Sequence, residues 1–400
     1  MKLPKKWGPI ISLVLFLGLV YMMYLDQDIR FPKSKKQVKK FEVIGSQIVG
    51  YDQGLRVWSI SADSVWSEQS DHIFYMKDIN SGDLYNYDGE AVVSDLKSGY
   101  LRANSHTKFL FSTGNVEANF VKTDTPIHVR AKQLTYTHYN RTLNFSREIN
   151  LRQNPYLLST DSAVYVSSSN ILTLPNSVQV HSPQYELSAN TATLNLDNNE
   201  AIFTGKLDLL RKADPDTGDI DPREAKLRKQ TLNIHSDTLV YKDKGTHCFQ
   251  GNVSAKQGKN MLNARRACFD SKTEGLDVQG PLVLHIHRLA EFLKEDISPD
   301  DPDVLSMSED PVDISAQQLR WDPEAQTLYF DGNVRFQQET QWLRAQTASI
   351  DDENDLITLI GDVQWTRPKK DLLKSEKVII DIKEQNFESV GPTHFEYYVD

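Results

Sequence analysis

A short motif recurs along this chain, and its period restricts the fold more than any other feature of the sequence. Each copy centres on a small residue, with an aliphatic residue two positions before it and an apolar residue three positions after it. Where no insertion intervenes, successive copies are 28 to 30 residues apart. The small residues of the nine copies are Ala62, Ala131, Thr160, Ala189, Ser236, Ala264, Ala316, Ala345 and Ser375. A repeat of this length predicts stacked units that share one core.

Apolar and polar residues alternate on both sides of each small residue, which predicts two half-buried strands per unit. The inward parity changes just after the small residue, so we expect a bulge or corner there rather than a straight strand. In the last six units a glycine follows 15 or 16 positions later, at the corner of the returning strand: Gly205, Gly251, Gly280, Gly332, Gly361 and Gly391. The pattern predicts an all-β, elongated roll of stacked V-shaped antiparallel strands whose walls enclose an apolar strip.

The residues predicted to line this strip lie two positions before, three after or five after a small residue. They are Ile60, Val65, Leu134, Tyr136, Tyr165, Leu194, Leu239, Tyr241, Phe269, Leu319, Trp321, Ile350 and Ile380. Such a strip is either the closed core of a β-sandwich or a slot for the apolar chains of a ligand. Composition alone favours the closed core, because apolar stripes usually pack against each other.

The N-terminal segment has the features of a membrane anchor. Nineteen residues between Lys6 and Asp26 carry no charge, close to the number that a helix needs to cross a bilayer. The A-x-A pattern of a signal-peptidase site is missing where it would be expected, so we predict an uncleaved signal-anchor helix over residues 1–25. Residues 26–40 read as a polar linker. Basic residues stand on both sides of the helix, so charge alone does not fix its orientation, but long domains are translocated largely regardless of charge.

Two charged insertions interrupt the repeat. Residues 211–229 contain two prolines and read as an exposed loop. We take this loop as the boundary between a first β module, residues 41–210, and a second, residues 230–400, although one continuous roll through the loop is the alternative. Residues 288–311 begin with a sequence compatible with a short helix and continue as an acidic loop.

Charge and motif content narrow the function. The chain carries a net charge of −10, of which residues 1–40 contribute +7 and the remaining residues −17. Such an acidic body lacks the basic surface that binds nucleic acid. The common signatures of hydrolases, nucleotide-binding proteins and metalloproteases are missing as well. We therefore expect neither an enzyme nor a cofactor.

Two further residue pairs leave alternatives open. His285 and His287 would face the same way on a strand, but no third metal ligand is evident near them, so we expect no metal. Cys248 and Cys268 are the only cysteines. They could form one disulfide in an exported protein, or remain as two free thiols.

The N-terminal anchor, the following segment FEVIGSQIVGYDQGLRVWSISADSVWSEQ, and the repeated Ala-x-x-apolar and Gly-Asn-Val units together resemble a known family. They resemble the membrane-anchored periplasmic component of the bacterial lipopolysaccharide-export (Lpt) system, which is LptC-like and built on the OstA-like β-jellyroll that LptA also has. The resemblance covers residues 7–400. The sequence is longer than the family pattern, because residues 230–400 add further units of the bridge-protein type.

This resemblance implies a function, a location and partners. It implies lipopolysaccharide or a related glycolipid as ligand, with the acyl chains in the roll, and a single-pass inner-membrane protein with its bulk in the periplasm. The implied partners are the inner-membrane ABC transporter and a downstream bridge protein or outer-membrane translocon. Because an open roll leaves an unpaired strand at each end, we expect the strands near Phe41–Ile48 to dock on the transporter and the tail at 394–399 to pair with the next roll. A tail folded back over its own sheet is the alternative. The main alternative is a membrane-tethered structural or polysaccharide-binding roll without lipid transport.

Overall fold

The computed structural model describes residues 39, 41–68, 72–121, 126–214, 228–243, 245–288, 310–339, 341–366, 372–381 and 386–396. The predicted membrane helix at residues 1–25 lies outside these residues, as does the polar linker apart from Lys39. Most of the charged loop at 211–229 and most of the segment 288–311 also lie outside them. In the described part of the chain, no helix is long and apolar enough to cross a membrane.

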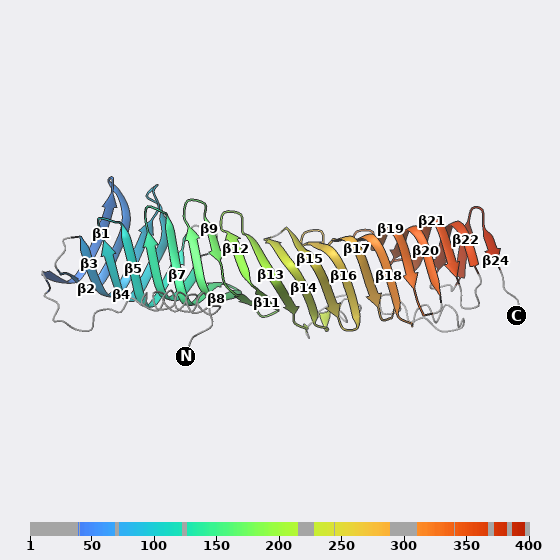
Figure 1. The fold of residues 1–400 in the computed structure, drawn as a ribbon, viewed down its shortest axis with the longest axis horizontal. Coiled ribbons are helices and arrows are strands. Elements are labelled where there is room, and N and C mark those ends of the chain that lie inside the picture. The colour runs from blue at the N-terminus through green and yellow to red at the C-terminus, as the bar shows by residue number, and fades with distance from the viewer. Residues whose placement is uncertain are drawn as a thin grey trace, which may run out of the picture.

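The described chain forms an all-β structure of 24 strands (Figure 1). The first half consists of β1 (Phe41–Asp52), β2 (Leu55–Ser67), β3 (Ile73–Tyr85), β4 (Ala91–Asn104), β5 (Phe109–Phe120), β6 (Ile127–Thr137), β7 (Thr142–Gln153), β8 (Tyr156–Val166), β9 (Ile171–Leu174), β10 (Val178–His181), β11 (Tyr185–Ala189), β12 (Thr191–Asn195) and β13 (Glu200–Arg211). The second half consists of β14 (Leu232–Lys242), β15 (Thr246–Gln257), β16 (Asn260–Asp270), β17 (Leu276–Ile286), β18 (Val312–Asp322), β19 (Thr327–Gln337), β20 (Trp342–Asp351), β21 (Leu356–Thr366), β22 (Leu372–Asp381), β23 (Asn386–Val390) and β24 (His394–Glu396).

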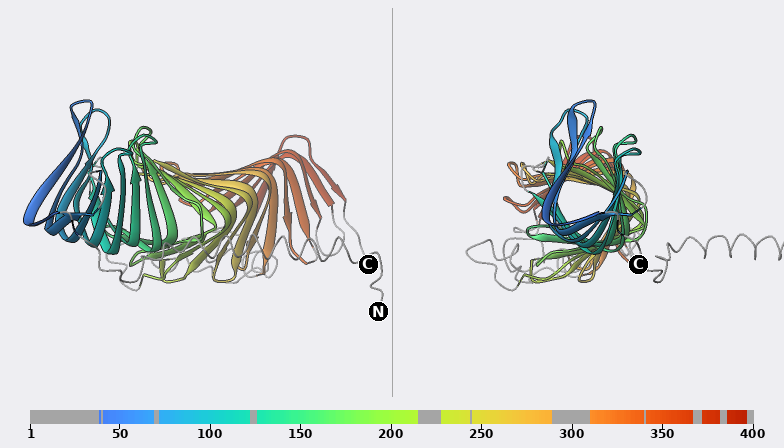
Figure 2. Two further views of the ribbon diagram at one scale, coloured as in Figure 1. Left: turned by 60° about the vertical axis from the view of Figure 1, so that its left-hand side comes forward. Right: turned by 90° about the vertical axis from the view of Figure 1, so that its left-hand side faces the viewer.

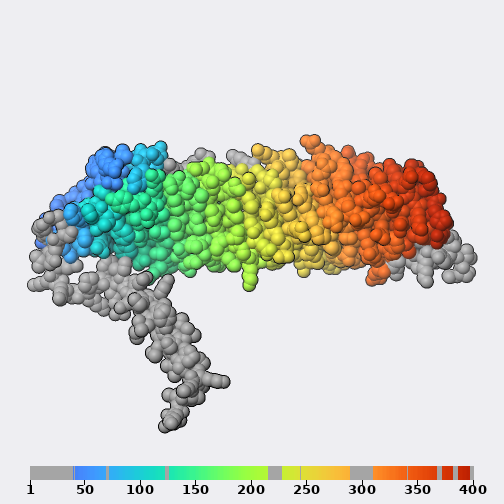
Figure 3. All heavy atoms as spheres, turned by 45° about the horizontal axis from the view of Figure 1, so that its top comes forward, coloured from blue at the N-terminus to red at the C-terminus, as the bar shows by residue number. Residues whose placement is uncertain are grey.

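The strands form one continuous antiparallel sheet in which each long strand pairs with the next along the chain. Four short strands replace two long ones: β9 and β10 both pair with β8, and β11 and β12 both pair with β13. Pro175 lies between β9 and β10, where its missing amide hydrogen interrupts the ladder. The sheet winds round its long axis (Figure 2) and forms a rod in space-filling view (Figure 3). These observations agree with the predicted elongated roll.

The corners lie where the sequence predicts them. The ladder between β18 and β19 skips two residues after Ser315, which include the small residue Ala316, and resumes at Gln318. On the facing strand Gly332 and Asn333 have φ angles of 83° and 54°, a left-handed conformation that favours glycine. A Cβ atom on Gly332 would also lie 2.8 Å from the Cβ of Gln317. Backbone conformation and close packing both require glycine at this corner.

The sheet runs without a break past the charged loop, since β13 and β14, which flank it, pair along most of their length. The core nevertheless divides into two clusters further along the chain. One cluster of buried apolar residues runs from Val57 to Leu239 and the other from Val253 to Ile380, and Phe249 packs against both. The change from one cluster to the other therefore lies at β14 and β15, beyond the predicted module boundary.

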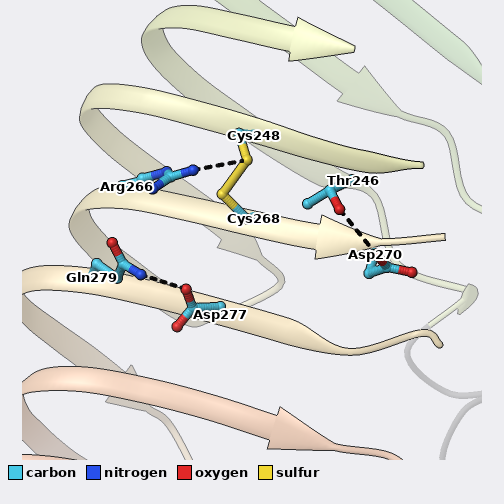
Figure 4. The surroundings of a disulfide bond; sticks show 7 residues. All are labelled: Thr246, Cys248, Arg266, Cys268, Asp270, Asp277 and Gln279. Carbon is cyan, nitrogen blue, oxygen red and sulfur yellow. Dashed lines mark hydrogen bonds between the residues drawn. A yellow bond between two sulfur atoms is a disulfide. The ribbon is translucent and has the colours of Figure 1, made fainter. Parts of the chain in front are cut away.

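A disulfide joins the two central strands β15 and β16 (Figure 4). Cys248 and Cys268 are directly opposite each other in the ladder, with Cα atoms 4.1 Å apart. The Nη2 atom of Arg266 lies 3.5 Å from the Cys248 sulfur. Of the two alternatives that the sequence leaves open for these cysteines, the structure shows the bridge. It lies where the two core clusters meet.

Candidate functional site

The small residues of the motif lie inside the roll. All nine are buried, from Ala62 at 2% exposure to Ala264 at 9%. On a straight strand, the apolar residues three and five positions after a small residue would point to the opposite face of the sheet. They face the same interior as the small residue, because the strand turns a corner between them. The change of inward face that the alternation predicts is confirmed.

The predicted strip residues fall into two long rows that cross the strands. The first, which we call the edge row, contains Tyr136, Tyr165, Leu194, Tyr241, Phe269, Trp321, Ile350 and Ile380, and the second, the central row, contains Val65, Leu134, Leu239 and Leu319. The remaining predicted residue, Ile60, is fully buried on the other side of the corner in β2. Most of these side chains are buried. Leu194, Tyr241 and Trp321 are half-buried.

Phe269 departs from the prediction of a buried strip, because 40% of its surface is exposed. It occupies its place in the edge row, opposite His247 on one side and Leu276 on the other. Leu276, opposite it, is only half-buried, as are Ile234 and Leu262 elsewhere on β14 and β16. Interior side chains are therefore less completely covered at β14 to β17 than at the N-terminal end.

The sequence analysis missed the members of both rows that stand on the strands between its aligned positions. In the central row these include Phe145, Phe203, Phe249 and Phe330. Each of these phenylalanines lies opposite an alanine on one of its two neighbouring strands. Phe145, for example, lies opposite Ala163. The apolar residues two and four positions before each corner glycine, such as Phe330 and Leu328 before Gly332, would have revealed them.

At the N-terminal end the interior is filled by the chain's own side chains. Leu134, Phe145 and Tyr165 are at most 1% exposed. At the C-terminal end a cavity of about 40 Å³ opens between Phe336, Leu343, Leu359 and Trp365, room for a few water molecules only. A long apolar chain could enter the N-terminal part only if the walls of the roll moved apart.

The turns between strands gather at two edges of the wound sheet. We call first edge the one with the turns after β1, β3 and β5, and second edge the one with the turns after β4, β6 and β8. Phe120 at the first edge packs with its ring centroid 4.9 Å from that of Tyr165 at the second edge. Near the C-terminus Trp365 and Phe387 pack across the edges in the same way, with centroids 5.3 Å apart. The two edges therefore meet near both ends of the described roll, and we call the line along which they face each other the seam.

In the centre of the roll, at β14 and β15, the edge row contains two aromatic residues with polar atoms. The rings of Tyr241 and His247 stack with their centroids 4.6 Å apart. Burial lowers the pKa of His247 and raises the pKa of Tyr241 to about 12, so both are neutral near pH 7. This part of the edge row therefore offers neutral aromatic faces.

The two histidines considered as metal ligands have separate partners. His285 Nδ1 lies 2.7 Å from Asp313 Oδ1, whereas His287 Nε2 lies 2.9 Å from Lys259 Nζ. Within the described residues, no group of three or more metal-ligating side chains comes together.

No protein-family model matches this sequence, and no curated protein matches it. Among solved structures, the chain is similar to LptH, the LptA-homologous periplasmic component of the conserved lipopolysaccharide transport device from Pseudomonas aeruginosa. The match has 14% sequence identity and a TM-score of 0.25. It covers 34% of this chain and 85% of LptH.

Proposed function

We propose that this chain binds lipopolysaccharide or a related glycolipid by its acyl chains and passes it along the roll. The observation that supports the proposal best is the edge row, which continues from strand to strand between Phe74 and Phe387. Its members are apolar or aromatic, with the neutral His247 as its most polar side chain. A ligand chain lying along this row would meet similar surroundings at every strand.

The energetics of such a site suit a sliding ligand. Each methylene group that leaves water gains about 0.8 kcal/mol, and similar slots along the row give no deep trap. At the N-terminal end the chain's own side chains fill these slots, so a ligand must replace their contacts there. The common nucleotide-binding signatures are missing from the sequence, so the energy for directed transport would come from a partner, which we propose to be the inner-membrane ABC transporter.

The two ends of the sheet support the proposal that the roll lies between two partner proteins. At the N-terminal end β1 pairs with β2, and on β1 Val43 and Ile44 are 47% and 83% exposed. Exposed strand edges favour pairing with a further strand. We propose that β1 docks on the periplasmic part of the transporter, with the segment 1–25 as the inner-membrane anchor.

The other end differs in detail from the prediction for the tail. His394–Glu396 pair with Leu372–Lys374 as the last strand of the chain's own sheet, and residues 397–400 lie outside the described residues. Phe387, Val390 and Phe395 are each about two-fifths exposed, at 38%, 41% and 46%. We propose that β23 and β24 together offer an edge to a bridge protein or an outer-membrane translocon.

A structural or polysaccharide-binding roll is the second candidate. The filled interior favours it, because a roll that never opens would have the same packing. The two functions differ in whether a glycolipid reaches the interior, and that difference can be measured directly.

The test uses the full chain in membrane vesicles that contain lipopolysaccharide. A photo-crosslinking amino acid replaces Trp321 in the edge row, and in a matched variant it replaces its exposed neighbour Arg320. We expect the first variant to capture lipopolysaccharide and the second to capture little. Equal labelling of both positions, or no labelling at position 321, would contradict a lipid-binding interior and favour the structural roll.

A further inference from the structure

The seam has a dense set of polar and aromatic contacts at its N-terminal end. The Tyr136 hydroxyl, at the second edge, donates a hydrogen bond of 2.9 Å to the Tyr85 carbonyl oxygen at the first edge. The Lys108 ammonium, at the second edge, donates one of 2.7 Å to the Tyr51 carbonyl oxygen at the first edge. Both bonds join parts of the sheet that are not neighbours in the ladder. They hold the two edges together.

His138 stands at the centre of these contacts. It is 3% exposed, and its Nδ1 lies 2.7 Å from the Tyr136 hydroxyl oxygen. Because that hydroxyl donates to Tyr85, the histidine Nδ1–H donates to it in turn. The imidazole stacks on Tyr87 with ring centroids 4.3 Å apart, and its Nε2 lies 3.9 Å from Asp52 Oδ2. Arg141 covers Tyr87, with its guanidinium carbon 4.2 Å from the ring centroid.

These residues come from both sides of the seam. Tyr51, Asp52, Tyr85 and Tyr87 belong to the first edge, and Lys108, Tyr136, His138 and Arg141 to the second. The side chains behind them are among the most deeply buried of the molecule, including Trp58 and Leu84 at 1% and 0% exposure.

We propose that these eight residues form a latch that holds the N-terminal seam shut, and that the latch must separate before an acyl chain can enter the roll between β1 and β6. The inference rests on the proposed function for its ligand, but the opening of the latch is a property of the chain alone. The two can therefore be tested separately.

The first test measures opening without any lipid. Hydrogen exchange of the full chain in detergent micelles is compared for Tyr136→Phe and for the matched variant Tyr165→Phe. Tyr165 is as deeply buried, but its hydroxyl donates to Asn170 Oδ1 within the second edge, at 2.8 Å. We expect Tyr136→Phe to speed exchange in the turns at 86–90 and 105–108 about five- to tenfold, the factor for a lost hydrogen bond of roughly 1 kcal/mol. Tyr165→Phe should leave these turns unchanged.

Unchanged exchange in Tyr136→Phe, or an equal rise in both variants, would overturn the latch. If Tyr136→Phe unfolds the whole roll, exchange will also rise in β18 to β22, and Lys108→Ala then replaces it. That side chain lies nearer the surface, and its loss should speed exchange in the same two turns about two- to fivefold.

The second test locks the seam. The double variant Tyr51→Cys/Lys108→Cys is joined by a short bismaleimide, and Leu55→Cys/Asp88→Cys, whose positions lie on the first edge alone, is the control. The native cysteines do not react, because they are bridged. A photo-crosslinker at Leu134 then reports capture of added lipopolysaccharide.

We expect the seam-spanning link to reduce capture at Leu134 at least tenfold and the control link to leave it unchanged. Equal capture in the locked and unlocked chains would overturn the latch while leaving the lipid-binding function intact. Capture missing from the unlocked chain as well would contradict the proposed function, and the exchange experiment alone would then decide on the latch.

Discussion

The N-terminal part of the roll, β2 to β8, and its centre, β14 to β17, follow the same repeat but are packed to different degrees. In the first part, the row members Leu134, Phe145 and Tyr165 are at most 1% exposed. In the centre, Ile234 and Leu262 are half-buried and Phe269 is 40% exposed. The motif decides which way a side chain points, but it does not decide how deeply that side chain is buried.

The two parts are also held together differently. The N-terminal seam is joined by hydrogen bonds and stacked rings across its edges, whereas two strands of the centre are joined by a disulfide. A covalent link adds stability where less apolar surface is buried. We therefore expect the stability of the N-terminal part to depend on packing and the stability of the centre to depend more on its disulfide.

The largest difference should follow removal of one phenylalanine ring from each part. Phe145 and Phe249 occupy the same row, each between a leucine and an alanine, but Phe145 is 1% exposed and Phe249 half-buried. Phe145→Ala should destabilise its region by about 3–5 kcal/mol and Phe249→Ala by about 1–3 kcal/mol. Hydrogen exchange in increasing urea, followed separately for β6–β8 and β14–β16, measures both, since an array of repeats need not unfold as one unit. Equal losses would remove the proposed contrast in packing.

Removal of the disulfide should have a smaller and local effect. Cys248→Ser/Cys268→Ser opens a loop with a sequence separation of 20 residues, for which the chain-entropy estimate is about 3 kcal/mol. We expect exchange to accelerate in β14 to β17 and to stay unchanged in β2 to β8. Treatment of the native chain with a reductant should reproduce the pattern, and a uniform acceleration along the roll would contradict it.

Acidification should have the smallest of these effects, a partial opening of the N-terminal seam. Burial, with contributions from Lys108 and Arg141, lowers the pKa of His138, and Asp52 opposes this shift. Tyr87 packs on His138 from the first edge, and burial raises the pKa of Tyr136, which contacts it from β6. Because the closed form binds the proton less well than the open form, the contribution of His138 to closure is present above the ordinary histidine range and is lost as the pH falls through and below it.

Spin labels at Tyr51 and Lys108 check this expectation by the distance between them at pH 8 and pH 5.5. A longer distance population should grow at the lower pH. In His138→Gln, which keeps a hydrogen-bonding side chain without the titration, that growth should disappear. A population that changes equally in both chains would assign the effect to other groups.

Local sequence pattern was sufficient for much of the fold. The parity of Ala316 and Leu319 predicts the corner and the inward face, and Gly332 predicts the returning turn, because backbone conformation and burial act over a few residues. The same repeat positions predict the members of the edge row, except those on the strands between the aligned positions. Pro175 marks the split of one long strand into two, because its missing amide hydrogen interrupts the ladder.

Contacts that depend on how the sheet winds could not be read from the sequence. The hydrogen bond of Tyr136 to Tyr85 joins β6 to β3, and Phe120 meets Tyr165 from β5 to β8. Which strand faces which across the seam depends on the tilt and twist accumulated over many strands. The exposure of Phe269 has the same origin, since it depends on what lies opposite.

Because the edge row continues from strand to strand, the number of strands sets the length of the roll. Neighbouring strands are spaced about 4.8 Å apart, so the nineteen strand positions from Phe74 to Phe387 extend over roughly 85 Å measured across the strands. One additional unit of two strands would lengthen the roll by about 10 Å without altering its cross-section. The distance that such a protein can span is thus encoded in the number of its repeats, and evolution can adjust that distance by duplication without redesigning the interior.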